Sequence, residues 1–162
     1  SDKNGEILAH ASATYAYDEA NYLFFGPSYS EKDKSGINYI KMHGRKIYEF
    51  AVTNVPTAMK ECLDSSGLDI TDVKKIFIHQ ANEKMDEAIV KRFYKAYGMP
   101  MPEGIMPMNI KENGNSSVAT IPTLFDMVKN GKLENHSIKK GDVVIFASVG
   151  AGMNINAIIY RH

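Results

Sequence analysis

Three short polar segments carry the side chains best suited to chemistry in this sequence. His79 directly follows the apolar run Val73–Ile78, and Asn115 lies in a glycine turn. The third segment, Gly150-Ala151-Gly152, separates two apolar runs near the carboxy end. Each segment is predicted to lie at the end of a strand or the start of a helix. Because ligands bind where such ends meet in layered α/β folds, we expect the three segments to form one site.

His79 and Asn115 together are suited to hold an oxygen that gains negative charge. The positive end of a helix dipole lowers the pKa of a nearby imidazole, so His79 is expected to stay neutral. A neutral imidazole has one N–H to donate, and the NH₂ group of Asn115 donates without a change of protonation. The pair is therefore a candidate enolate or oxyanion clamp. A histidine at a strand end more often satisfies only backbone groups, and spacing alone leaves that interpretation open.

The loop Gly150-Ala151-Gly152 is a candidate anion-binding turn. Two of its residues lack a Cβ, so the backbone N–H groups, including that of Ala151, can approach an anionic oxygen. A structural turn that needs positive φ explains the same spacing equally well.

The obvious nucleophiles are predicted to have structural roles. Cys62 falls on the apolar face of a helix, where a thiol is usually inert core. Ser116 or Ser117 could pair with His79 as in a hydrolase, but no G-x-S-x-G motif is present. Helix capping explains these two serines better.

The elements that must position these residues follow from composition, apolar runs and turn residues for the strands and from helical spacing of apolar residues for the helices. Strands are expected over Ile7–Tyr17, Val73–Ile78, Val143–Val149 and Asn154–Tyr160, and helices over Ile47–Leu63, Met85–Ala96 and Ile121–Val128. Pro56 lies inside the first helix, so we expect a kink there or two helices in tandem. The glycine, proline and serine residues of Tyr22–Tyr39 predict a long loop.

Composition is that of a soluble, single-domain protein over residues 1–162. Hydrophobic residues make up 44% and charged residues 23%. Nineteen basic and nineteen acidic residues cancel, so neither nucleic acid nor a membrane is an expected partner. A single cysteine excludes an intramolecular disulfide and suits the reducing cytoplasm. We find no apolar run long enough to span a membrane, and Ser1–Glu6 lacks the apolar core of a signal peptide.

Four longer segments carry a family resemblance. They are MHGRKIYEFAV (42–52), FIHQAN (77–82), NGNSSVATIPTLF (113–125) and GDVVIFASVGAGMNINAIIYR (141–161). In this order and spacing they resemble the carboxy-terminal half of the 3-oxoacyl-acyl-carrier-protein synthase III family. The resemblance implies a thiolase-like α/β fold, a mixed sheet covered by helices in α-β-α layers, and a homodimeric full-length enzyme of fatty acid biosynthesis.

The resemblance also implies roles for the three polar segments. His79 and Asn115 would be catalytic and would hold the malonyl thioester carbonyl during decarboxylation. The resulting enolate would attack an acyl group carried on cysteine. The Ala151 N–H, flanked by Gly150 and Gly152, would form half of the oxyanion hole for that acyl group.

Substrates and partners follow from the same resemblance. The substrates would be acyl-CoA and malonyl-acyl carrier protein, with no cofactor and no metal. Gln80, Asn82 and Lys84 are expected to contact the substrate or the carrier. Lys84 occupies a position near the pantetheine entrance where a cation suits an acidic carrier protein, although an ordinary solvated lysine fits the position equally well.

Two departures from the family pattern limit what the resemblance implies. The family's nucleophilic cysteine lies in the amino-terminal half, and nothing in these 162 residues matches its surroundings. We therefore expect a fragment that begins after the first strand of the second half, is inactive alone and self-associates. In addition, Met153-Asn154-Ile155-Asn156 stands where the family commonly has Thr-Trp-Gly. The acyl preference is therefore left open.

Several other functions fit the same residues. One is another thiolase-fold synthase, of the hydroxymethylglutaryl-CoA or chalcone type or of secondary metabolism. Another is a noncatalytic module that binds CoA or carrier protein. An α/β hydrolase is the least supported.

Overall fold

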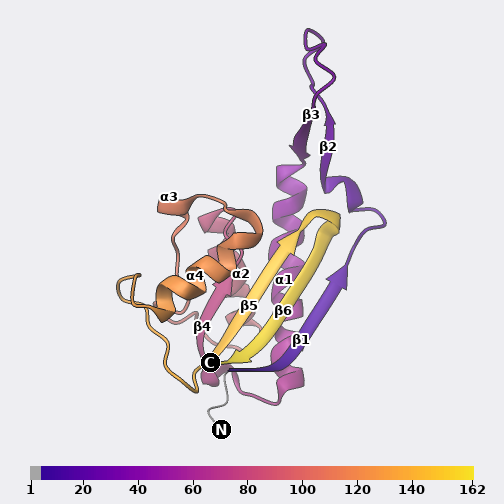
Figure 1. Cartoon of the computed structure of the whole chain (residues 1–162). Coiled ribbons are helices and arrows are strands. Elements are labelled where there is room, and N and C mark those ends of the chain that lie inside the picture. Colours follow the sequence, from indigo (N-terminus) through magenta and orange to yellow (C-terminus); the bar gives the residue numbers. More distant parts are fainter. Residues whose placement is uncertain (1–4) are drawn as a thin grey trace.

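The computed structural model describes residues 5–162. Figure 1 shows a twisted four-stranded sheet with helices on both faces and a two-stranded hairpin that projects beyond one end. This mixed α/β architecture confirms the predicted fold class. No helix within residues 5–162 is long and apolar enough to cross a membrane.

The sheet contains the four strands that the sequence predicted. Their order is β1 (Glu6–Thr14), β6 (Asn154–Arg161), β5 (Val143–Gly150) and β4 (Val73–Ile78). The pair β4 and β5 is parallel and the other two pairs are antiparallel. Because β4 and β5 are parallel, their carboxyl ends meet at one edge of the sheet, and these ends lead into the candidate site.

Two long helices cover one face of the sheet. α1 (Gly44–Ser66) packs across β1, β6 and β5, and α2 (Glu83–Lys95) lies beside it (Figure 1). The strands contribute alternate residues, such as Ile76 and Ile78, to this core. Cys62 is fully buried in the same core and its Sγ lies 3.4 Å from the Ala157 carbonyl oxygen. Burial also raises the pKa of this thiol, which agrees with the predicted inert role.

The opposite face is covered only in part. α4 (Thr120–Lys129) packs its Leu124 and Val128 against Phe77 and Val144 of β4 and β5. Within residues 5–162 no helix covers β6 and β1 on this face (Figure 1). A hollow of about 340 Å³ remains there, lined by apolar side chains that include Phe125, Phe146 and Ile158. We call this the uncovered face.

α1 forms one helix through Pro56, so of the two expected alternatives the pair of helices in tandem is wrong. Proline has no N–H to donate to the carbonyl of Val52, four residues earlier. The guanidinium of Arg92 on α2 donates to that carbonyl instead, with Nη1 2.8 Å from the oxygen. A neighbouring helix therefore satisfies the acceptor that the proline leaves.

The expected loop over Tyr22–Tyr39 is largely an antiparallel hairpin, which corrects the sequence prediction. β2 (Leu23–Pro27) pairs with β3 (Asn38–Met42), and only the segment between them is irregular. Aromatic and β-branched side chains face one another across such a pair and stabilise it, and this outweighs the glycine, proline and serine signals of the turn. The hairpin stands over the carboxyl edge of the sheet (Figure 1).

The segment before α4 also differs from expectation. A four-residue helix, α3 (Ile110–Asn113), ends at Gly114, whose φ is 60°. The N-cap of α4 is Ala119, and neither Ser116 nor Ser117 caps the helix with its side chain. Thr120 begins α4 directly from a short 3₁₀ turn, so the predicted capping role of the serines is wrong.

Candidate active site

The three polar segments converge at the carboxyl edge of β4 and β5. His79, Asn115 and Gly150 line two adjoining hollows there. The larger hollow has a volume of about 700 Å³ and also contacts Ala151. The smaller hollow has a volume of about 310 Å³ and also contacts Asn82. The convergence expected from strand-end geometry is therefore present.

His79 is held by the strand that precedes it. The backbone N–H of His79 donates to the Ala147 carbonyl at 2.9 Å, which continues the β4–β5 ladder by one residue. Burial lowers the pKa of the half-buried His79 ring below 6.5 and outweighs an opposing interaction with the Ser117 backbone. The lowered pKa agrees with the sequence expectation, but its cause is different. Burial lowers it rather than the helix dipole, because α2 begins only at Glu83, four residues after His79. A neutral imidazole is therefore favoured at pH 7.

The side chain of Asn115 is oriented by the backbone of Ser117. The Ser117 N–H donates to Asn115 Oδ1 at 2.9 Å, so the carboxamide oxygen is already used. Within residues 5–162 the Asn115 NH₂ group has no intramolecular hydrogen-bond partner, and Asn115 lines both hollows. The NH₂ group can therefore donate to a ligand.

The glycine loop closes the edge of the site. Gly150 is extended, and Ala151–Met153 forms a 3₁₀ turn in which Gly152 has a φ of 73°. Such a φ favours glycine, in agreement with the predicted need for positive φ. Ala151 is exposed at the larger hollow. Met153 follows with a φ of 48° and is buried against the smaller hollow.

Gln80 does not face the site, which contradicts its expected contact with the substrate or carrier. Its side chain is fully buried. Nε2 donates to the Pro107 carbonyl at 3.0 Å, and Oε1 accepts from the Asn109 N–H at 3.0 Å. Both ends of the Gln80 amide thus bond the backbone of the segment 107–109, just before α3, to the end of β4.

Asn82 and Lys84 occupy the start of α2. Asn82 is the N-cap, with Oδ1 accepting the Met85 N–H at 3.2 Å, and it also lines the smaller hollow. Lys84 is exposed in the first helical turn. Both positions are compatible with contact to an incoming ligand, and Asn82 has a structural role as well.

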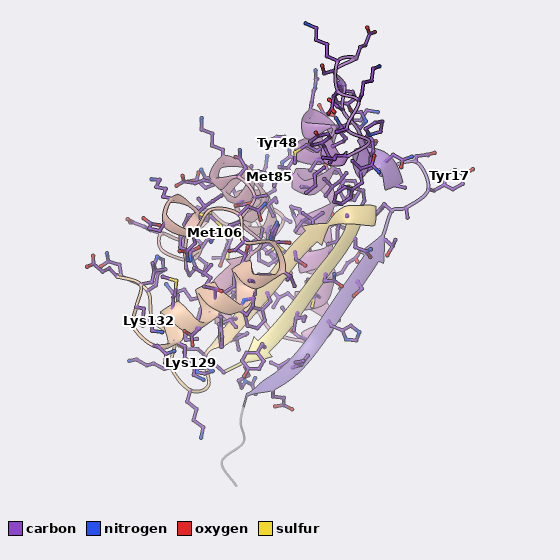
Figure 2. All side chains as sticks on the ribbon, turned by 45° about the horizontal axis from the view of Figure 1, so that its top comes forward. Tyr17, Tyr48, Met85, Met106, Lys129 and Lys132 are labelled. Atoms are coloured by element: carbon purple, nitrogen blue, oxygen red, sulfur yellow. The ribbon has the colours of Figure 1, made fainter. Side chains whose placement is uncertain are left out.

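The apolar wall of the smaller hollow was not anticipated from sequence. Its side chains come from the hairpin, both long helices and the glycine loop: Leu23, Met42, Ile47, Tyr48, Met85 and Met153. Figure 2 labels Tyr48 on α1 and Met85 on α2. The alternation of apolar residues in Asn38–Met42 was the one signal that could have indicated the hairpin's contribution.

A metal-ligand cluster is absent from the part of the chain that the structure describes. Over residues 5–162 no three or more His, Cys, Asp or Glu side chains are grouped so as to hold an ion. The polar groups that converge on the hollows are instead hydrogen-bond donors.

Comparison with known proteins identifies the family. The family model for the 3-oxoacyl-[acyl-carrier-protein (ACP)] synthase III C terminal matches residues 63–162. The chain belongs to this synthase III family. A beta-ketoacyl-[acyl-carrier-protein] synthase III of Pyropia yezoensis is 32% identical over 124 residues, which are 76% of this chain and 35% of the relative. The enzyme of the same name from Erythrobacter litoralis is 28% identical over 98% of this chain and 45% of its own.

Solved structures of synthase III proteins have the same fold. The crystal structure of 3-oxoacyl-[acyl-carrier-protein] synthase III from Aquifex aeolicus aligns with a TM-score of 0.79 at 26% identity, over 100% of this chain and 46% of that one. The crystal structure of the corresponding synthase from Thermus thermophilus aligns with a TM-score of 0.76 at 26% identity, over 96% of this chain and 46% of that one. The chain therefore has the carboxy-terminal thiolase-like fold and spans about a third to a half of the length of these relatives.

Proposed function

We propose that this chain supplies the malonyl-activating half of a decarboxylating condensing enzyme of fatty acid biosynthesis. The complete enzyme would join an acyl group carried on cysteine to malonyl-acyl carrier protein. The observation that carries the proposal is the convergence of His79, Asn115 and the glycine loop on the same hollows. The Ser117 backbone N–H holds Asn115 Oδ1 at 2.9 Å, so the NH₂ group of that carboxamide is left to donate. Family membership supports the reaction type.

The chemistry of the pair suits decarboxylation. When the malonyl thioester loses CO₂, the electrons of the broken carbon–carbon bond move to the thioester oxygen and form an enolate. The neutral His79 N–H and the Asn115 NH₂ would donate to that oxygen. Donors already in position stabilise developing charge without reorganisation, and each is typically worth about 10² to 10³ in rate.

The second half of the reaction would use the glycine loop. The enolate carbon attacks the acyl thioester carbon, the carbon–sulfur bond breaks, and the cysteine leaves as a thiolate. The Ala151 N–H, between Gly150 and Gly152, would donate to the oxygen of the tetrahedral intermediate. The cysteine and the second donor would come from the amino-terminal part of a full-length protein, as expected for a chain that matches 35–46% of its relatives.

The two hollows suit the two substrates. The smaller one has an apolar wall with Asn82 at one side, which fits a slender arm that carries a thioester. The larger one would receive the acyl group. Lys84 is exposed beside the smaller hollow's Asn82 and Met85, where a cation would attract an acidic carrier protein.

The proposal extends to partners and compartment. It includes acyl-CoA and acyl carrier protein as ligands, a homodimeric full-length enzyme and a cytoplasmic location. It includes no resident cofactor, and residues 1–162 act as one domain. Because the nucleophile is not matched in this sequence, the 162-residue polypeptide alone would not catalyse condensation.

The proposal is tested by separating decarboxylation from condensation in the full-length protein. Release of labelled CO₂ from malonyl-acyl carrier protein is measured for His79→Ala and Asn115→Ala. We expect each rate to fall about 10²- to 10³-fold. The matched control is Asn130→Ala, because Asn130 is exposed at the end of α4 and lines neither hollow.

Two outcomes would overturn the assignment. One is decarboxylation at the wild-type rate in both site variants. The other is saturable CoA binding that His79→Ala leaves unchanged in a full-length protein without turnover, which would identify a noncatalytic binding module.

A further inference from the structure

A polar ladder crosses the uncovered face directly beside the larger hollow. Asn154 and Asn156 of β6 lie opposite Thr14 and Ser12 of β1 in the antiparallel register. The Ser12 hydroxyl donates to Asn156 Oδ1 at 2.8 Å. The Thr14 hydroxyl donates to Asn154 Oδ1 at 2.5 Å. The two carboxamides are therefore held in fixed orientations by the neighbouring strand.

Both asparagines belong to the wall of the hollow that contains the proposed catalytic pair. Residues two apart on a strand share a face, and Asn154 and Asn156 both line the larger hollow with His79 and Ser148. Ile155, between the two asparagines, points into the core on the other face. The two asparagine side chains therefore lie on the face of β6 opposite to the core.

The hydrogen-bond pattern leaves their amide nitrogens available. Each Oδ1 is occupied by a hydroxyl, and within residues 5–162 neither Nδ2 has an intramolecular partner. Asn154 Nδ2 lies close to the glycine loop, since a Cβ added to Gly152 would be 3.4 Å from it. The wall therefore presents N–H donors both at the loop and further along β6.

We propose that Asn154 and Asn156 select an acyl group that carries its own oxygen, such as a hydroxyl or keto group, beyond the thioester. This inference rests on the proposed function and names the substrate class of the same site. A plain alkyl chain against this wall would cover the amide N–H groups without replacing their hydrogen bonds to water, which is unfavourable. An oxygen on the chain would accept from them.

The spacing along β6 indicates where that oxygen lies. Residues two apart on a strand are separated by about 7 Å. Asn154 is close to the turn that would hold the thioester oxygen, so Asn156 would meet an oxygen several carbons further along the chain. The polar group is therefore expected in the middle or at the end of a short acyl chain.

The test is competition between matched acyl-CoA primers in the full-length protein. Hexanoyl-CoA competes with analogues that carry a hydroxyl at carbon 3, 5 or 6, and the ratio of kcat/KM values is measured. We expect at least one hydroxylated primer to be preferred about tenfold, the contribution of one or two neutral hydrogen bonds. Asn156→Leu, which has nearly the same size, should abolish or reverse the preference. Asn130→Ala should leave it unchanged.

The outcomes separate this inference from the proposed function. Equal or better use of hexanoyl-CoA by the wild-type protein would overturn the inference, and so would an unchanged primer ratio in both Asn156→Leu and Asn156→Ala. The ladder would then contact another part of the protein rather than the substrate. Failure of the proposed function would instead show as full decarboxylation in His79→Ala and Asn115→Ala.

Discussion

The backbone of Ser117 orients the carboxamide of the proposed catalytic pair, because its N–H donates to Asn115 Oδ1 at 2.9 Å. Ser117 has a φ of 53°, in the left-handed region that side chains other than glycine rarely adopt. Such strain persists where surrounding contacts over-determine the conformation, as at functional sites. The contact with Asn115 is one of those contacts here.

Asp86, seven residues after His79, is a buried acid whose carboxylate has no hydrogen-bond partner in the described part of the chain. It lies in the first turn of α2, is fully buried, and has no hydrogen-bond partner for either carboxylate oxygen within residues 5–162. Burial raises the pKa of this carboxyl to about 7, against a smaller lowering by the Asn82 backbone. Burial thus outweighs the favourable position of an acid at a helix start.

This buried acid predicts a stability that declines as pH rises. The folded-state pKa of Asp86 lies above its unfolded value of about 3.9, so the folded protein binds more protons between about pH 4 and 7. The free energy of unfolding therefore falls across that window, by up to a few kcal/mol. Asp86→Asn removes the titration and should flatten the dependence. Urea denaturation at pH 5 and pH 8 measures both.

The control for this prediction is Asp18→Asn, because Asp18 is exposed. It should follow the wild-type pH dependence. Equal slopes for wild type and Asp86→Asn would show that Asp86 does not titrate in this range.

At the scale of elements, α1 and α2 are joined by a hydrogen bond from Arg92 to the carbonyl that Pro56 leaves without a helical donor. Pro56 leaves the Val52 carbonyl without its helical donor, and Arg92 of α2 supplies one at 2.8 Å. Hydrogen bonds to charged donors contribute about 1.5–3 kcal/mol, and partial exposure of Arg92 reduces that range. The contact fixes how the two helices lie beside each other, and both line the smaller hollow.

A double-mutant cycle tests this contact. Arg92→Ala should lower the free energy of unfolding by about 1–2 kcal/mol, because the Val52 carbonyl loses its donor. In a Pro56→Ala background the backbone N–H of residue 56 can donate instead, so the same change should cost about 1 kcal/mol less. Thermal and urea denaturation of the four proteins give the coupling energy. A cost that is identical in both backgrounds would refute the assignment.

At the scale of the whole molecule, the uncovered face determines how this polypeptide behaves by itself. The hollow lined by Phe125, Phe146 and Ile158 is apolar, and α4 does not extend over it. Exposed apolar patches of this kind mark interaction surfaces. In a full-length protein the remaining half of the chain would be available to cover the part around Phe125, Phe146 and Ile158, none of which lines the larger hollow. Asn156 lies at the border, because it lines both hollows.

We therefore predict that the 162-residue polypeptide self-associates and does not catalyse condensation. Light scattering should give a mass above that of a monomer at micromolar concentration, and Ile158→Lys should shift it toward monomer because a charge on the patch opposes its burial. A compact monomer at all concentrations would contradict the first part. Measurable turnover with acyl-CoA and malonyl-acyl carrier protein would contradict the second.

The sequence accounts for most of the fold but for fewer of the contacts at the site. Helical spacing of apolar residues predicted α1, α2 and α4, apolar runs bounded by turns predicted β4, β5 and β6, and Ala and Thr content indicated β1. The hairpin was missed because each strand has only five residues and β2 itself ends in Gly26 and Pro27, which are turn signals. The donor to the Val52 carbonyl beside Pro56 could not be predicted, because Arg92 is 40 residues away from Val52 in sequence.

Residue type and order along the chain were sufficient to bring His79, Asn115 and the glycine loop together, since parallel strands end at one edge of a sheet. Only the tertiary structure decided which polar groups remain available there. It assigns the Gln80 amide to the backbone of Pro107 and Asn109, the Asn115 oxygen to Ser117 and the Asn156 oxygen to Ser12, while Asn115 and Asn156 both line the larger hollow. A side chain's chemistry is set by its type, but its free hydrogen-bonding capacity depends on neighbours that are distant in sequence.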